Sequence, residues 1–160
     1  MCIRDSIKGR SENKGLIVLV RDESMLEEYF LVDKNILNKY SQIQKPLTII
    51  LKTRKDFPQI VSAGTENVAV RISSNPFVKE LFNHIDQPVT STSANISGSG
   101  NLVEIEDICE YFFNKVDLIV DSGNIPHSSG SAIVDLTKNP PIIIREGDLS
   151  TSEIKEFLSG

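Results

Sequence analysis

The chain has 160 residues, 39% of them hydrophobic, which suits one compact domain with a sizeable core and no bilayer-spanning apolar run. Its formal net charge of −5 disfavours a broad basic surface that holds nucleic acid through many phosphates. Its two cysteines, Cys2 and Cys109, and its two histidines lack metal-ligand spacing, so neither a disulfide framework nor a metal site is expected.

The first six residues, 1–6, show neither helical nor strand periodicity and run into Ile7 without a cap or a turn. They resemble translated sequencing-adapter sequence, so we exclude them from the fold and expect the domain to occupy residues 7–160. We find no apolar secretory segment, and we therefore expect a cytoplasmic protein that makes no contact with a membrane.

The first half of the chain predicts alternating strands and helices. The apolar run 15–20 has the length of a strand that is covered on both faces. Residues 22–40 carry apolar side chains at helical spacing, with Asp33 placed to cap the second of two helices. Runs 46–51 and 68–72 are β-branched and bounded by turn residues, which indicates two strands joined by a loop that ends at Gly64.

The second half continues the alternation. Asn75 and Pro76 are a cap and a first helical residue, and the helix that they begin ends before Pro88. A strand beginning at Val89, a helix over 102–112 and strands over 118–120, 131–136 and 142–144 follow, and Ser150 has capping-box spacing for a last helix. The pattern predicts an α/β domain with a mixed sheet.

The polar stretch 90–100 is the first candidate site, because its small residues follow a strand and are too polar for a core. Backbone N–H groups of such residues form anion-binding concavities, and the hydroxyls of Ser91, Thr92, Ser93 and Ser97 add donors. Equally, these hydroxyls could satisfy only the neighbouring backbone in capping turns.

Cations in three places could hold an anionic ligand. Lys8, Arg10 and Lys14 concentrate positive charge before the first strand, whereas Arg71 and Arg145 each lie at a strand end. A solvated charge cluster or ordinary surface ion pairs would explain the same residues. The sequence contains no phosphate-binding P-loop, nucleophile elbow or activated cysteine, so no side chain is expected to act as a covalent nucleophile.

Four ordered segments resemble the YrdC-type threonylcarbamoyl-AMP synthases. They are Lys8-Gly9-Arg10 with the strand 16–20, residues 68–71, the loop 90–98, and residues 131–137 with 144–147. The resemblance runs from Ile7 over nearly the whole chain. It implies a single YrdC-like α/β domain with a twisted mixed sheet flanked by helices.

This resemblance implies an enzyme that makes threonylcarbamoyl-AMP from L-threonine, bicarbonate and ATP, and that uses Mg²⁺ with the nucleotide. A tRNA-modifying transferase complex would then place the threonylcarbamoyl group on tRNA adenosine, and some family members bind double-stranded RNA. Implied ATP contacts are Lys8, Arg10, Lys14, Asn67, Ser93, Asn95, Asn101 and Arg145. Implied threonine contacts are Arg71, Ser91 and Ser131.

The sequence also departs from the family pattern. Ser11 replaces the usual proline after Lys-x-Arg, Ser73-Ser74-Asn75 replaces Pro-x-His, and Lys14, Asn67 and Asn101 differ from the usual contact residues. The family's N-terminal Pro-Thr-Asp-Thr-Val-Tyr-Gly-Leu strand is also missing from the domain that we expect. A noncatalytic module that binds nucleotide or double-stranded RNA is therefore the alternative hypothesis. A domain of a larger carbamoyl-transfer enzyme is less favoured, because the chain shows no zinc-finger segment.

Overall fold

A computed structural model describes residue 7 and residues 15–95, 102–124 and 126–159. These residues form two compact units, each of which combines distant parts of the chain. The larger unit holds the described residues of 15–91 and 129–160, and the smaller unit holds those of 1–14 and 92–128. The proposed boundary between residues 6 and 7 lies partly outside the described residues and stays a prediction.

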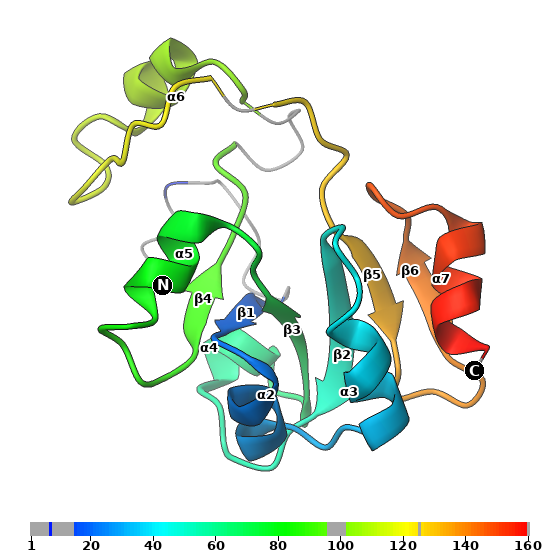
Figure 1. Cartoon of the computed structure of the whole chain (residues 1–160). Coiled ribbons are helices and arrows are strands. Elements are labelled where there is room, and N and C mark those ends of the chain that lie inside the picture. The colour runs from blue at the N-terminus through cyan, green and yellow to red at the C-terminus, as the bar shows by residue number, and fades with distance from the viewer. Residues whose placement is uncertain (1–6, 8–14, 96–101, 125, 160) are drawn as a thin grey trace. The chain divides into compact units, whose positions relative to one another are not determined.

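The larger unit is built on a six-stranded mixed sheet with the order β4-β1-β3-β2-β5-β6 (Figure 1). Parallel pairs are β1 with β3 and β2 with β5, whereas β1–β4, β2–β3 and β5–β6 are antiparallel. The strands are β1 (Ile17–Val20), β2 (Leu47–Lys52), β3 (Asn67–Ile72), β4 (Val89–Ser91), β5 (Ala132–Asp135) and β6 (Ile142–Arg145). The predicted α/β class with a mixed sheet is confirmed.

The two faces of this sheet differ in character because successive strand residues point to opposite sides. On the first face, alternate residues such as Val18, Val70, Ile49 and Val134 are at most 1% exposed and belong to one core cluster. The second face carries the residues between them, and several of these, including Arg71, are half-buried. Hydrophobic burial on the first face thus leaves the second face available for polar side chains.

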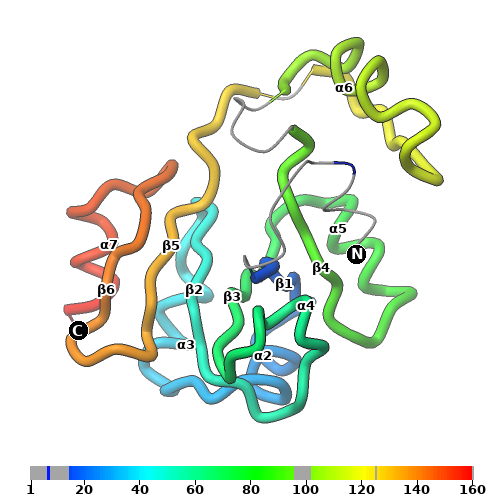
Figure 2. The backbone as a smooth tube through the Cα atoms, turned by 180° about the vertical axis from the view of Figure 1, so that it is seen from behind, coloured from blue at the N-terminus to red at the C-terminus, as the bar shows by residue number. Residues whose placement is uncertain are grey.

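Helices α2, α3 and α7 cover the first face, lying before the strands in Figure 1 and behind them in Figure 2. Their buried residues are Met25 and Leu26, Leu37 and Tyr40, and Ile154 and Phe157. Full burial of a side chain of this size contributes roughly 1.5–3 kcal/mol. The labelled helices among the described residues are α2 (Glu23–Tyr29), α3 (Lys34–Tyr40), α4 (Gln59–Ser62), α5 (Pro76–Leu81), α6 (Ile105–Phe112) and α7 (Thr151–Leu158).

The predicted helix caps are confirmed. The side chains of Asp33 and Asn75 accept hydrogen bonds from the first turns of α3 and α5, and Ser150 begins α7 with a reciprocal capping box. The single turn α4 lies within the segment that the sequence suggested was a loop. It ends at Ala63, a non-glycine residue with a φ of 52°.

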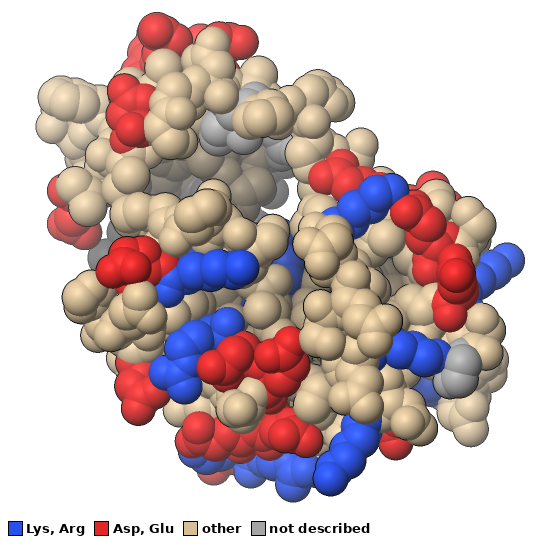
Figure 3. Space-filling view, viewed as in Figure 1, with Lys and Arg blue, Asp and Glu red and all other residues tan. Residues whose placement is uncertain are grey.

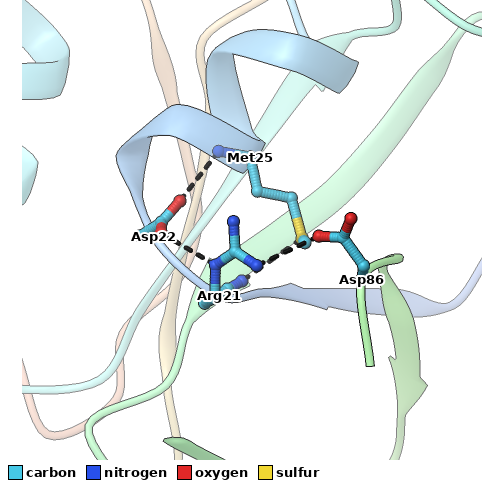
Figure 4. A network of polar contacts seen from close by, with 4 residues as sticks. All are labelled: Arg21, Asp22, Met25 and Asp86. Atoms are coloured by element: carbon cyan, nitrogen blue, oxygen red, sulfur yellow. Dashed lines mark hydrogen bonds and ion pairs between the residues drawn. The ribbon is translucent and has the colours of Figure 1, made fainter. Parts of the chain in front are cut away.

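A polar network at the end of β1 links the start of α2 to the connection between α5 and β4 (Figure 4). Arg21 donates from Nε to Asp22 at 2.9 Å and from Nη1 to Asp86 at 3.0 Å. Asp22 in turn accepts from the backbone N–H of Met25 at 2.9 Å as the cap of α2. Since Asp86 is largely exposed, this network contributes little stability, but it ties two connections together.

The smaller unit corrects one prediction from the sequence. Residues 118–120 do not form a strand, and none of the described residues of this unit does. An apolar β-branched run needs a neighbouring strand to pair its backbone, and this segment has none among those residues. Leu118 is instead 77% exposed and Val120 50% exposed.

No helix in the described part of the chain is long and apolar enough to cross a bilayer. Among the labelled helices, α6 and α7 are the longest, with 8 residues each.

Glu153 gives the capping box of α7 a measurable pH dependence. Lys45 Nζ lies 2.6 Å from its carboxylate, and Ser150 donates to it from both the backbone and the hydroxyl at 2.9 Å. These hydrogen bonds, that from Lys45 first, hold the pKa of Glu153 at about 2, below the usual 4.5. Because the folded-state pKa is depressed, ionised Glu153 stabilises the fold above about pH 4.5 and loses this effect as the pH falls toward 2.

We therefore expect Glu153→Gln to lower the Tm at pH 7, and we expect this difference to shrink on acidification through that range. A glutamine side chain can still complete a capping box, so the variant removes mainly the charge. Thermal unfolding followed by circular dichroism from pH 7 to pH 2 measures the effect. Glu156→Gln, on the same helix, is the control. A Tm difference that stays constant down to pH 2 would contradict the assignment.

Candidate functional site

The larger unit brings five of the predicted site residues, Asn67 among them, onto the second face of its sheet. Ser91 is aligned with Ile17 and Ile17 with Ala69, which shares a face with Arg71 two residues further along β3. Toward the opposite edge of the sheet, Arg145 on β6 is aligned with Ile133 on β5. Ser131 lies two residues before Ile133 and therefore shares its face. Because side chains alternate between the two faces along each strand, polar groups far apart in the sequence come to lie on one face.

Arg71 is the most unusual of these residues because its charge is partly removed from water. Its Nε is buried and has no hydrogen-bond partner among the residues that the structure describes. Burial lowers the pKa of the guanidinium, and the nearby hydroxyl of Tyr40 acts in the opposite direction. A guanidinium remains charged in proteins, and an unsatisfied buried donor is costly, so this group is suited to an anionic ligand such as a carboxylate.

The Tyr40 hydroxyl lies between the backbones of β2 and β3 beside Arg71. This buried hydroxyl donates to the carbonyl oxygen of Leu47 at 2.5 Å and accepts from the backbone N–H of Ile72 at 3.3 Å. The aligned residues of β2 and β3 end at Ile49 and Val70, although both strands continue to Leu47 and Ile72. The hydroxyl therefore bridges two backbone groups that a regular ladder would pair directly. Burial raises the pKa of Tyr40, so the hydroxyl keeps its proton.

Ser131 is held by contacts to its side chain and to its backbone. Thr48 Oγ1 donates to Ser131 Oγ at 2.8 Å, and the two residues are 0% and 3% exposed. Arg145 donates to the Ser131 carbonyl oxygen from Nη2 at 2.7 Å and from Nε at 3.3 Å. Arg145, a predicted ATP contact, therefore also fixes the backbone of a predicted threonine contact.

The segment 128–132 packs closely against the segment that follows β6. The backbone N–H of Asp148 donates to Gly130 O at 2.9 Å, and its carboxylate accepts from the backbone of Ser129 at 2.8 Å. A Cβ on Gly147 would lie 2.3 Å from Gly130 O and 2.5 Å from the backbone of Ser131. Only glycine allows these two backbones to approach so closely.

Asn67 and Ser91 lie away from this cluster. Asn67 shares a face with Arg71 but is at the other end of β3, four residues away, which corresponds to roughly 13 Å along a strand. Ser91 is on β4, two strands from β3, or roughly 10 Å across the sheet. The long side chain of Arg71 could reach part of the distance to Ser91, whereas Asn67 is too far to share a small ligand with Arg71.

The smaller unit carries the described part of the hydroxyl-rich loop. Ser93 Oγ donates to Asn95 Oδ1 at 2.5 Å, so the Ser-x-Asn pair is in mutual contact. Thr92, Ser93 and Ala94 line one side of a cavity of about 530 Å³. Its other lining is mainly apolar and comes from α6 and the segment after it, including Ile105, Ile108, Phe112, Val116, Leu118 and Val120.

The cavity has the size and the mixed lining of a small-molecule site. Lys115 lies at its wall, with Nζ 3.7 Å from the centroid of the Tyr111 ring, and the Tyr111 hydroxyl donates to Ile7 O at 2.8 Å. Lys8, Arg10, Lys14 and Asn101, the remaining predicted ATP contacts, lie outside the described residues. Their roles stay predictions.

Sequence reasoning missed Thr48, Tyr40 and the apolar cavity. Thr48 and Tyr40 were indistinguishable from ordinary strand and helix residues, since their partners are up to 83 positions away in the chain. The exposed segment 118–120, which lines this cavity in part, was wrongly predicted as a strand. For Thr48, the local signal was a hydroxyl-bearing residue within the apolar run 46–51.

Residues 5–147 match the protein family of Sua5, YciO and YrdC, which is described as "Telomere recombination". A Methanocaldococcus jannaschii protein provisionally named as a threonylcarbamoyl-AMP synthase is 37% identical over 145 residues. That match covers 89% of this chain and 67% of the relative.

Solved structures give the same picture. The crystal structure of Pyrococcus abyssi Sua5 complexed with L-threonine matches with a TM-score of 0.88 at 26% identity, over 98% of this chain and 46% of that one. Escherichia coli YciO matches with a TM-score of 0.80 at 26% identity, over 94% of this chain and 74% of that one. The chain thus spans about half the length of the Sua5 chain.

Replacing Tyr40 by phenylalanine should destabilise the larger unit. The substitution removes the group that satisfies Leu47 O and the N–H of Ile72, and we expect the free energy of unfolding to fall by about 1–3 kcal/mol. Urea unfolding should show a lower midpoint with an unchanged slope. Tyr29→Phe is the matched control, expected to change stability by less than about 0.5 kcal/mol. An unchanged midpoint in Tyr40→Phe would mean that the ladder closes without the hydroxyl.

Replacing Gly147 by alanine tests the close approach of the two backbones around Ser131. The added methyl group would collide with backbone atoms that cannot rotate away, so we expect a loss of more than about 2 kcal/mol in unfolding free energy. Gly64→Ala is the control, because its Cβ would enter open space at a φ of 73° and cost only about 1 kcal/mol. Equal losses in the two variants, measured in urea, would contradict the packing argument.

Proposed function

Because the chain belongs to the Sua5/YciO/YrdC family, we propose that it forms threonylcarbamoyl-AMP from L-threonine, bicarbonate and ATP. The observation that carries the proposal is the half-buried Arg71, whose Nε lacks a described partner, on the same sheet face as Ser91 and Ser131. Since the chain spans about half the length of the Sua5 chain, the activity of the whole protein is part of this proposal.

We propose that threonine binds with its carboxylate against Arg71. A guanidinium offers two parallel N–H donors that match the two oxygens of a carboxylate. Ser131, which precedes β5 and is bonded to Thr48 on β2, and Ser91 on β4 would contact the remaining polar groups of the amino acid. The threonine bound in the P. abyssi Sua5 crystal supports an amino-acid site in this fold.

For ATP, we propose the hydroxyl-lined loop and the cavity of the smaller unit. Ser93 and Asn95 would contact the phosphates, with Lys8 and Arg10 supplying the positive charge. The apolar lining from α6 suits the flat base of a nucleotide. Arg145 would be a further contact to ATP, and Lys14, Asn67 and Asn101 complete the proposed set.

The proposed chemistry depends on positioning and electrostatics. The threonine amine forms a C–N bond to the carbon of bicarbonate with loss of water, and an oxygen of the resulting carbamate attacks the α-phosphorus and displaces pyrophosphate. Holding three reactants in one geometry supplies much of the acceleration, and cations stabilise the charge that develops on phosphate. No covalent enzyme intermediate is required.

Further partners follow from the family resemblance. We propose that Mg²⁺ arrives on the triphosphate, whose oxygens are the hard ligands that it prefers. Side chains of the described residues gather in no group of three or more potential metal ligands. Transfer to tRNA by a partner complex and a cytoplasmic location remain predictions.

The alternative of a noncatalytic RNA-binding module is less well supported by charge. In Figure 3, Lys and Arg atoms are interleaved with Asp and Glu atoms over the face that carries α2 and α3, without a continuous basic patch. The net charge of −5 points the same way. Duplex RNA held by surface cations would dissociate steeply with rising salt, whereas ATP in a pocket responds less.

The direct test is to measure whether the purified chain releases pyrophosphate from ATP in the presence of Mg²⁺. We expect release only when threonine and bicarbonate are both present, together with a product that has the mass of threonylcarbamoyl-AMP. Release that is independent of threonine would contradict the proposal. ATP binding without any turnover would favour the noncatalytic alternative.

Arg71→Lys should weaken the binding of threonine more than the binding of ATP. Lysine keeps the charge but loses the planar pair of donors, so we expect the KM for threonine to rise about ten-fold or more while the KM for ATP changes less than two-fold. Arg21→Lys, at an exposed arginine in the same unit, is the control. Equal increases in both KM values would place Arg71 outside the threonine site.

A further inference from the structure

Thr48 is a polar residue at one of the most buried positions of the molecule. It lies on β2 between Leu47 and Ile49, and its exposure is 0%. Burying a hydroxyl is unfavourable unless it forms a hydrogen bond, and valine has nearly the same shape without that requirement. Stability of the strand alone therefore does not explain a threonine at this position.

The hydroxyl of Thr48 has one described partner, and that partner is a predicted substrate contact. Thr48 Oγ1 donates to Ser131 Oγ over 2.8 Å. Because this bond uses a lone pair of the Ser131 oxygen, the hydrogen of Ser131 remains available as a donor. Thr48 thus determines which way the Ser131 hydroxyl can donate.

Thr48 also lies between the strands that carry Arg71 and Ser131. It is aligned with Ile133 on β5, two residues after Ser131. On its other side, Ile49 and Val70 are the last aligned pair of β2 and β3. Thr48 and Arg71 are the residues next to this pair on their strands, and both point to the face opposite to it. Thr48 and Arg71 therefore share the second face of the sheet with Ser131, which immediately precedes β5.

We propose that Thr48 is a positioning residue for the threonine substrate, which it serves by orienting the Ser131 hydroxyl to donate to an oxygen of the amino acid beside Arg71. This inference rests on the proposed function. Thr48 itself does not contact the substrate. Without its hydrogen bond, the Ser131 hydroxyl rotates among staggered positions and donates to the substrate in only some of them.

Isosteric substitution tests this role. In Thr48→Val we expect the Kd for threonine, measured by isothermal titration calorimetry, to rise about three- to ten-fold, the range that one hydrogen bond typically contributes. The Kd for ATP should change less than two-fold. Thr48→Ser keeps the hydroxyl and should restore threonine affinity to within two-fold of the wild type.

A control variant separates positioning from general damage. Thr53→Val removes another hydroxyl next to β2, one that donates to Glu66 O at the other end of the strand. We expect it to leave both affinities unchanged. Urea unfolding of each variant shows whether a change in affinity merely follows a loss of stability.

A double-mutant cycle then decides whether Thr48 acts through Ser131. In a Ser131→Ala background, Thr48→Val should produce no further loss of threonine affinity, because the hydroxyl that it orients is gone. Additive losses would overturn the proposal, as would an unchanged threonine Kd in Thr48→Val. Parallel losses of threonine and ATP affinity would show a purely structural role.

The wild type is measured first, which keeps the two proposals distinguishable. If the wild type fails to bind threonine, both the function and the role of Thr48 are overturned. If the wild type binds threonine and the Thr48 variants behave otherwise than expected, only the positioning role is overturned.

Discussion

The partial burial of the Arg71 guanidinium is the interaction on which the site depends. A charged group that loses water must find compensation from other polar groups, and the buried Nε of Arg71 has no described partner within the protein. The Tyr40 hydroxyl bridges the backbones of Leu47 and Ile72, just beyond the last aligned pair of β2 and β3. The sheet thus holds a cation in place with donor capacity that an anionic ligand can use.

The alternation of side chains along the strands places the core residues on one face of the sheet and the candidate site residues on the other. Valines and isoleucines of alternate positions pack against α2, α3 and α7, and the positions between them carry Arg71, Thr48 and Ser131. A register slip of one residue on β2 or β3 would exchange the two sets and expose the core. Correct strand register is therefore a requirement of both the fold and the proposed site.

The extent to which the sequence predicted this structure follows from the range of each interaction. Helix caps at Asp33, Asn75 and Ser150 depend on residues two or three positions away, and all three were predicted. The strand expected over 118–120 was wrong, since pairing depends on neighbours that a local apolar run does not reveal. The contacts of Thr48 and Tyr40 cross between strands and helices, so only the folded chain reveals them. The resemblance to the family predicts Arg71, Ser131 and Arg145 as ligand contacts, but it does not reveal the residues that hold them.

The polar groups that hold the candidate site residues in place are not explained by stability alone. A buried ion or hydroxyl pair is often no more stabilising than apolar residues of the same shape, and natural domains keep such groups at functional sites despite the cost. Thr48 with Ser131, and Arg145 with the Ser131 backbone, fit this description, because each orders a neighbour of Arg71 more than it strengthens the core. Their joint presence on one face of the sheet therefore supports the proposed site for a small polar ligand.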